Sequence, residues 1–160
     1  MKRIQLPFSP YFSLVLLLIL VACSGMPHVI RDFPVVDMPY QLANQNTDGY
    51  QGTPVRWGGT VIEVENETDS SLMQVVYYPL DRNGFPRTSE TGEGRFAVQT
   101  SDFLDPAILA KNRKVTIIGT LAGGIERMVG NKRIRIPLVT SEAIYLWPED
   151  YGADRAYGYS

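Results

Sequence analysis

The most reactive side chains in this sequence are its single cysteine, Cys23, and its single histidine, His28. A Ser–His–Asp or Cys–His mechanism needs its histidine in a cleft beside the nucleophile. His28 follows Cys23 by five residues, in a stretch without strand or helix periodicity, so we do not expect such a mechanism. With one cysteine, the chain can form neither an intramolecular disulfide nor a thiolate zinc cluster.

Carboxylates supply the second kind of candidate chemistry. Glu63, Glu65 and Glu67 stand at alternate positions, which places them on one face of a strand. Acid–base catalysis by paired carboxylates needs burial that separates their pKa values, whereas we expect this face to be solvated. Asp102 and Asp105 are expected to cap a short helix, and no EF-hand spacing occurs. The sequence therefore predicts no enzyme and no metal site.

The residues before Cys23 determine what its thiol can do. A cationic start, Met1-Lys2-Arg3, precedes an uncharged apolar run from Phe12 to Val21. Ten helical residues cover only about 15 Å of a hydrocarbon core about 30 Å thick, so the run is too short to span a bilayer. It matches the apolar region of a signal peptide. The following Leu20-Val21-Ala22-Cys23-Ser24 resembles the lipobox of bacterial lipoproteins.

This resemblance predicts cleavage between Ala22 and Cys23 and a diacylglyceryl group on the thiol, with a further acyl chain on the new amine. Each buried CH₂ contributes about 0.8 kcal/mol, so two or three chains hold a protein firmly. No other cofactor is predicted. By analogy with lipoproteins of two-membrane bacteria, Ser24 favours the outer membrane, with the domain facing the periplasm. A plain secretory signal, or a cysteine buried in the fold, is the alternative.

Aromatic and basic side chains could form a ligand-binding face. The candidates are Trp57, Tyr77, Arg95, Arg127, Lys132, Arg133 and Arg135. Such side chains on a small barrel often bind oligonucleotides or sugars. A net charge of −2, made two units more negative by loss of Lys2 and Arg3, argues against nucleic acid. Envelope glycans, anionic envelope components or proteins remain as partners, and the alternative is an edge hairpin whose charges only maintain solubility.

Four segments follow from composition: a leader (1–22), a lipidated N-terminus and tether (23–54), a β domain (55–148) and a Tyr/Gly-rich, mobile tail (149–160). Prolines interrupt residues 24–54, which could either extend as a tether or wrap the domain.

Alternating apolar residues predict the strands of the β domain. They fall at residues 55–65, 72–80, 95–100, 114–121 and 139–147, and residues 125–128 and 132–136 flank a hairpin tip at 129–131. Gly58-Gly59 predicts a bulge or bend in the first strand, and Gly123-Gly124 a bend in the fourth. Residues 103–111 predict one short helix between strands three and four. This order matches a mainly β, five-stranded Greek-key barrel of the OB type; an open β-sandwich is the alternative.

Four short motifs behind the lipobox carry a family resemblance. They are Arg56-Trp57-Gly58-Gly59, Pro79-Leu80-Asp81, Gly94-Arg95-Phe96 and Phe103-Leu104-Asp105-Pro106. Together they resemble the Slp family of starvation-inducible outer-membrane lipoproteins of Gram-negative bacteria, over residues 23 to about 147. The resemblance implies an outer-membrane lipoprotein linked to stationary phase or stress, with a structural or interaction role and no established enzymatic activity.

Overall fold

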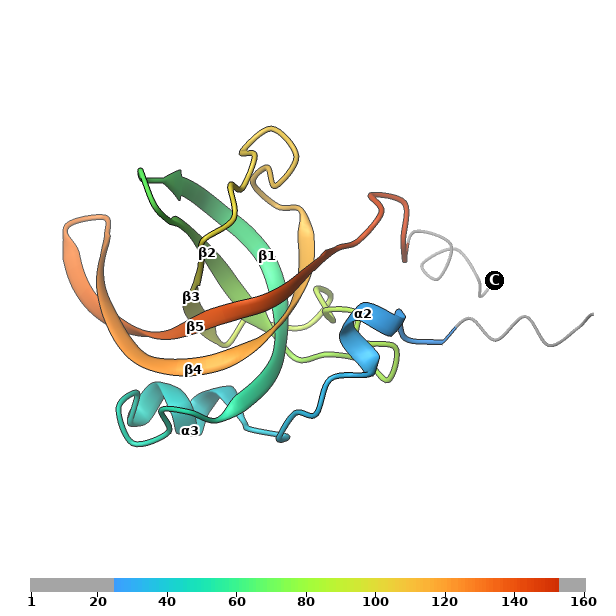
Figure 1. Cartoon of the computed structure of the whole chain (residues 1–160), viewed down its shortest axis with the longest axis horizontal. Coiled ribbons are helices and arrows are strands. Elements are labelled where there is room, and N and C mark those ends of the chain that lie inside the picture. The colour runs from blue at the N-terminus through green and yellow to red at the C-terminus, as the bar shows by residue number, and fades with distance from the viewer. Residues whose placement is uncertain (1–24, 153–160) are drawn as a thin grey trace, which may run out of the picture.

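Five strands close into a barrel in the computed structural model, which describes residues 25–152 (Figure 1). They are β1 (Pro54–Asn66), β2 (Ser71–Tyr78), β3 (Gly94–Thr100), β4 (Lys114–Val129) and β5 (Lys132–Leu146). The order around the barrel is β1-β2-β3-β5-β4, in which β3 and β5 pair in parallel and the other neighbours are antiparallel. This confirms the mainly β, OB-type barrel and excludes the open sandwich. The leader, Cys23 and residues 153–160 lie outside the described residues.

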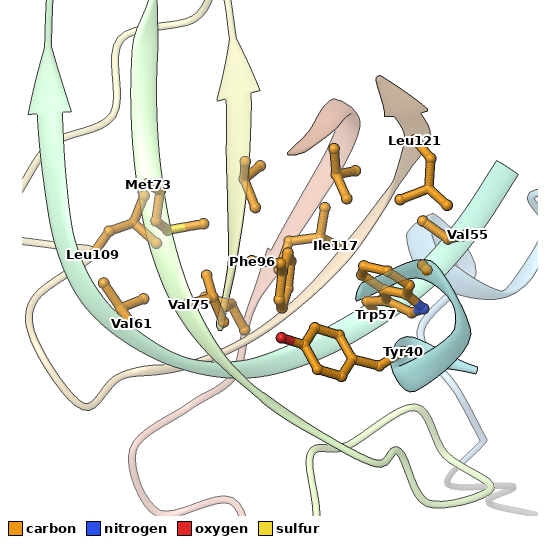
Figure 2. Packing of buried hydrophobic residues seen from close by; sticks show 14 of the residues in the cluster. Tyr40, Val55, Trp57, Val61, Met73, Val75, Phe96, Leu109, Ile117 and Leu121 are labelled. Carbon is orange, nitrogen blue, oxygen red and sulfur yellow. The ribbon is translucent and has the colours of Figure 1, made fainter. Parts of the chain in front are cut away.

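The barrel interior is filled by alternate residues of the strands, because successive side chains of a strand point to opposite faces. The buried cluster is shown in Figure 2 and includes Val55, Trp57, Val61, Met73, Val75, Phe96, Val98, Val115, Ile117, Leu121 and Val139. Most are β-branched or aromatic, the residue types that suit a pleated and half-buried surface. The predicted hairpin is confirmed, since Val129 pairs with Lys132 across Gly130 and Asn131.

The predicted helix at residues 103–111 is wrong, because the segment between β3 and β4 forms turns. Asp105 Oδ1 accepts a hydrogen bond from the Ala107 amide at 2.8 Å, and the Asp105 carbonyl accepts one from the Leu109 amide at 2.9 Å. This single turn ends before Asn112, whose φ of 71° is left-handed. Leu104 and Leu109 are both buried, but a helix would point them about 140° apart. A tight turn around Asp105 allows both leucine side chains to point into the core.

The N-terminal segment wraps the barrel instead of extending as a tether. It contains the short helices α2 (His28–Arg31) and α3 (Tyr40–Gln45). Ile30, Tyr40 and Ala43 are buried, and the Val36 amide donates to the carbonyl of Pro54 at 2.9 Å. None of the helices in residues 25–152 is long and apolar enough to cross a bilayer.

Of the bulge or bend predicted at Gly58-Gly59, the bulge is not present. The register shift in β1 lies between Val61 and Glu63, whereas Gly59 pairs regularly with Tyr77 on one side and Val115 on the other. A Cβ at Gly59 would stand 1.7 Å from the carbonyl oxygen of Val76. The glycine is needed for close approach of two strands. The predicted bend at Gly123 is confirmed, since φ there is 92° and the register shifts between Leu121 and Gly124.

We expect Gly59→Ala to destabilise the domain by at least about 1–3 kcal/mol, because overpacking forces backbone to move. The contact involves the Val76 backbone, which cannot rotate away as a flexible side chain could. Urea unfolding measures the effect. Gly25→Ala is the matched control, since a Cβ there meets nothing within 4 Å. Equal unfolding midpoints for the two variants would contradict the close strand approach.

Candidate functional site

Of the two aromatic residues of the predicted ligand face, Trp57 is buried in the barrel and Tyr77 is partly buried. Trp57 is only 2% exposed, and its indole N–H donates to the carbonyl of Met38 at 3.0 Å. Its ring meets Phe96 edge-on at 5.4 Å, and Figure 2 shows the Tyr40 ring reaching from α3 into the same cluster. Tyr77 stacks on Tyr40 with ring centroids 4.6 Å apart. Trp57 therefore cannot present an open surface to a ligand.

The tyrosine hydroxyls of this cluster are held neutral. Burial raises the pKa of Tyr40 to about 12, and its hydroxyl donates to the Arg95 carbonyl at 2.8 Å. Burial also raises the pKa of Tyr77 to about 12, with Glu93 and Asp37 adding to the shift. Neither hydroxyl is prepared to act as a base near neutral pH.

The basic half of the predicted face is divided between the two sides of the β4–β5 hairpin. Arg127 pairs with Ile134, and Arg133 with Met128, so alternation places Arg127 on one side and Arg133 and Arg135 on the other. Lys132 is exposed at the turn, and Arg95 lies half-buried on β3. The structure therefore brings Arg133 and Arg135 onto one face, as predicted, but without the aromatic residues.

Carboxylates pair with all three hairpin arginines. Arg127 contacts Glu65 and lies 3.8 Å from Glu63. Arg133 lies 3.5 Å from Glu126, and Arg135 binds Asp48 at 2.8 Å. The hairpin is thus close to neutral, with Lys132 and Arg133 as its most accessible cations.

The predicted glutamate face is solvated: Glu63, Glu65 and Glu67 are exposed. Beside it lies a shallow polar cleft of about 340 Å³, lined by Glu63, Glu65, Gln74, Glu126, Arg127 and Met128. Gln74 is buried and donates to Glu63, while its own carbonyl oxygen accepts no hydrogen bond from any residue between 25 and 152. Sequence reasoning missed Gln74 because it stands among apolar residues of β2.

His28 and the remaining carboxylates do not assemble a reactive centre. His28 is exposed on α2, with Nδ1 3.2 Å from Asp32. Asp102 is also exposed, and Asp105 holds the turn described above. Within residues 25–152, no three histidine, cysteine, aspartate or glutamate side chains lie close enough to hold a metal ion.

A groove lies between the N-terminal segment and the loop after β2, and Trp57 and Tyr77 of the predicted ligand face are among the residues that line it. It has a volume of about 420 Å³, and its lining also includes Met26, Val36, Met38, Leu80, Arg56 and Arg87. Arg56 donates to the carbonyls of Ile30 at 2.6 Å and Arg31 at 3.1 Å. Burial lowers the pKa of the Arg56 guanidinium. This side chain fastens the end of α2 to β1.

The four family motifs hold the fold together. In the motif Arg56-Trp57-Gly58-Gly59, Arg56 donates a hydrogen bond to the end of α2 and Trp57 donates one to the Met38 carbonyl. Gly59 permits the close pairing of two strands. In the second, Asp81 Oδ1 accepts hydrogen bonds from the amides of Asn83 at 2.8 Å and Phe85 at 3.0 Å.

The remaining two motifs also make structural contacts. The Arg95 carbonyl accepts the Tyr40 hydroxyl, and Phe96 fills the core. Asp105 forms the turn that carries Leu104 into the core. Each motif therefore has a structural explanation.

Comparisons with known proteins agree on one family. Residues 20–160 match the model of the Outer membrane lipoprotein Slp family. The Outer membrane protein Slp of Escherichia coli (strain K12) is 29% identical over 131 residues, which cover 81% of this chain and 69% of that protein. An uncharacterized lipoprotein of the same strain, YeaY, is 27% identical over 115 residues, or 71% of this chain and 59% of the relative. The chain thus spans less than two thirds of YeaY.

Two solved structures overlap the barrel. One is OBody NL8 bound to hen egg-white lysozyme, with a TM-score of 0.38, 15% identity, and coverage of 61% of this chain and 97% of that chain. The other is a small single-stranded DNA-binding protein from Streptomyces coelicolor, with a TM-score of 0.40, 13% identity, and coverage of 59% and 94%.

Proposed function

This chain belongs to the Outer membrane lipoprotein Slp family, and from that premise we propose that lipid on Cys23 anchors it to the outer membrane. There it serves a non-enzymatic, structural or interaction role in the cell envelope. The observation that carries the proposal is that the family match begins at residue 20, so it includes the lipobox Leu20–Ser24 together with the barrel. The name of the relative, Outer membrane protein Slp, supports the same location.

The non-enzymatic part of the proposal is supported by the structural contacts that the motif residues make. Arg56, Trp57 and Asp105 all make contacts that hold segments of the chain on the barrel. Enzyme families usually place polar side chains in a concave site with partners suited to catalysis. Here the motif side chains are used to position backbone. Contacts of this kind maintain the shape of the domain, which suits an interaction role.

Intact mass and sucrose-gradient fractionation of the wild-type protein, expressed in a two-membrane bacterium, test the proposal. We expect a chain that begins at Cys23, carries the mass of two or three acyl chains, and sediments with the outer membrane. Added protease should degrade the domain only after the outer membrane is permeabilised, since we propose that it faces the periplasm. An uncleaved or soluble product would contradict the anchor, and degradation in intact cells would contradict the orientation alone.

A second candidate function is the binding of an anionic or glycan component of the envelope by the β4–β5 hairpin. Its specific support is the exposure of Lys132 and Arg133 beside the turn, where the Arg133 side chain is 71% exposed. Arg135 shares that face and is held by Asp48. Guanidinium groups bind phosphate and carboxylate in a bidentate manner, so this face is chemically suited to such ligands.

We expect Arg133→Glu combined with Arg135→Glu to leave the fold intact and to weaken any binding of lipopolysaccharide. Both arginines form exposed ion pairs, which contribute about 0–1 kcal/mol each. Circular dichroism measures the fold, and titration with purified lipopolysaccharide measures affinity. Arg31→Glu, also exposed but on α2, is the matched control. Wild-type affinity that the double variant leaves unchanged would contradict a binding role for the hairpin.

A further inference from the structure

The chain between the proposed anchor and the folded domain is very short. Met26 follows Cys23 by three residues, and an extended chain spans at most about 3.3–3.6 Å per residue. The Cα atoms of Cys23 and Met26 are therefore within about 11 Å of each other. Met26 packs against the buried cluster that contains Ile30 and Trp147. A lipid anchor on Cys23 would consequently hold the domain itself, rather than a loose tether, next to the bilayer.

The position of Met26 decides which end of the domain meets the bilayer. Figure 1 shows α2 beside the point where the described chain begins, with the β4–β5 hairpin at the other end of the longest axis. The hairpin is therefore directed away from the anchor. The face around α2, formed by residues 25–38 and the neighbouring loop 79–87, is the anchor face.

The anchor face carries apolar side chains that the domain does not cover. Val29 is 55% exposed on α2 and Val36 is 50% exposed. Successive helical residues point about 100° apart, so the burial of Ile30 turns Val29 outward. Val36 lines the same groove as Met26, with its amide fixed to the Pro54 carbonyl. Val29 follows Cys23 by six residues and Val36 by thirteen, so both lie in the N-terminal segment that joins the anchor to the barrel.

The anchor face is balanced in charge. Its basic residues are Arg31, Arg82 and Arg87, and its acidic residues are Asp32, Asp37 and Asp81. Attraction to anionic lipid requires clustered basic residues that are not offset by acids. Contact with a bilayer through this face would therefore depend on the apolar side chains and hardly on lipid charge.

We propose that, when Cys23 is acylated as the proposed function requires, the anchor face rests on the phospholipid surface with Val29 and Val36 in its interfacial layer. Side chains of this kind bury apolar surface at the boundary between headgroups and acyl chains. The occupant of the face is the membrane that holds the anchor. In this orientation α2 lies between the barrel and the membrane. The hairpin with Lys132 and Arg133 points into the aqueous space, where it can contact partners.

Site-directed spin labelling of the full acylated protein tests this orientation. A new cysteine at Val29, Val36 or Met128 would carry the only free thiol, because acylation blocks the single native one. Met128, on the hairpin, is the matched control, since it is apolar and 57% exposed. The labelled proteins are reconstituted in phosphatidylcholine vesicles, and collision rates with oxygen and with a water-soluble nickel chelate are measured.

We expect labels at positions 29 and 36 to collide with oxygen several-fold more, relative to nickel, than a label at position 128. The contrast should persist when a third of the lipid is phosphatidylglycerol. The opposite result is the same aqueous accessibility at all three positions of the acylated, vesicle-bound protein. That result would contradict the contact of the anchor face with the membrane but not the lipid anchor itself. If the intact mass shows no acyl chain, the proposed function fails and the anchor face fails with it. Both valines are exposed, so if a label at one position disturbs folding, the label at the other position is sufficient to test the orientation.

Discussion

Cys23→Ala is expected to move the protein almost completely from the outer-membrane fraction to the soluble fraction. Alanine has no thiol to receive a diacylglyceryl group, and Cys23 is the only cysteine in the chain. Each buried CH₂ contributes about 0.8 kcal/mol, so the loss of two or three acyl chains removes far more free energy than any surface contact can replace. Sucrose-gradient fractionation and intact mass, measured beside the wild type, give the result.

The anchor face should not rescue membrane binding in that variant. Full burial of a valine contributes roughly 1.5–3 kcal/mol, and even one myristoyl chain gives only marginal, reversible binding. Val29 and Val36 therefore orient a domain that lipid already holds. Ser24→Ala is the matched control, because it preserves the thiol and its small neighbour Ala22. A Cys23→Ala protein that remains with the outer membrane would contradict the lipid anchor.

The barrel could be predicted because its information is local. Alternation along each strand, a tip at Gly130-Asn131 and a bend at Gly123 are all properties of neighbouring residues, and the structure confirms them. The wrapping of the N-terminal segment is not encoded in this way. It depends on hydrogen bonds from Arg56 to Ile30 and from Trp57 to Met38, between residues 26 and 19 positions apart. No periodicity within residues 25–53 could reveal those partners.

The burial of Trp57 was missed for a different reason. Residue type suggested that Trp57 binds a ligand, and the alternation along the first strand did not by itself decide whether its ring is buried. Val55, Trp57 and Val61 share parity along β1, and all three are buried. Glu63 and Glu65 have the same parity and are exposed, because the register of β1 shifts between Val61 and Glu63. Alternation counted back from the glutamates would therefore have placed Trp57 on the solvent face. The division of the hairpin arginines, by contrast, follows from the predicted tip, since it fixes which residues lie opposite each other.

Trp57→Ala is expected to destabilise the domain by about 3–5 kcal/mol, the usual cost of removing a large aromatic side chain from a core. The indole lies within 5.6 Å, centroid to centroid, of the rings of Tyr40 and Tyr77 and within 5.4 Å of Phe96. Its removal leaves a cavity where α3 meets the barrel and leaves the Met38 carbonyl without its donor. Domains are stable by only about 5–15 kcal/mol, so the variant would approach unfolding in water. Urea unfolding, followed by the fluorescence of Trp147, measures the loss.

Trp57→Phe separates packing from hydrogen bonding. Phenylalanine retains an aromatic ring among Tyr40, Tyr77 and Phe96 but cannot donate to Met38, so its cost contains the lost hydrogen bond, about 0.5–1.5 kcal/mol, and a smaller cavity. Increased exchange of amide hydrogens in residues 36–45 of that variant would show that this bond holds the N-terminal segment on the barrel. A Trp57→Ala protein within about 1 kcal/mol of wild type would instead mean that the indole is a surface group. That result would contradict the structural role of Trp57 in the core.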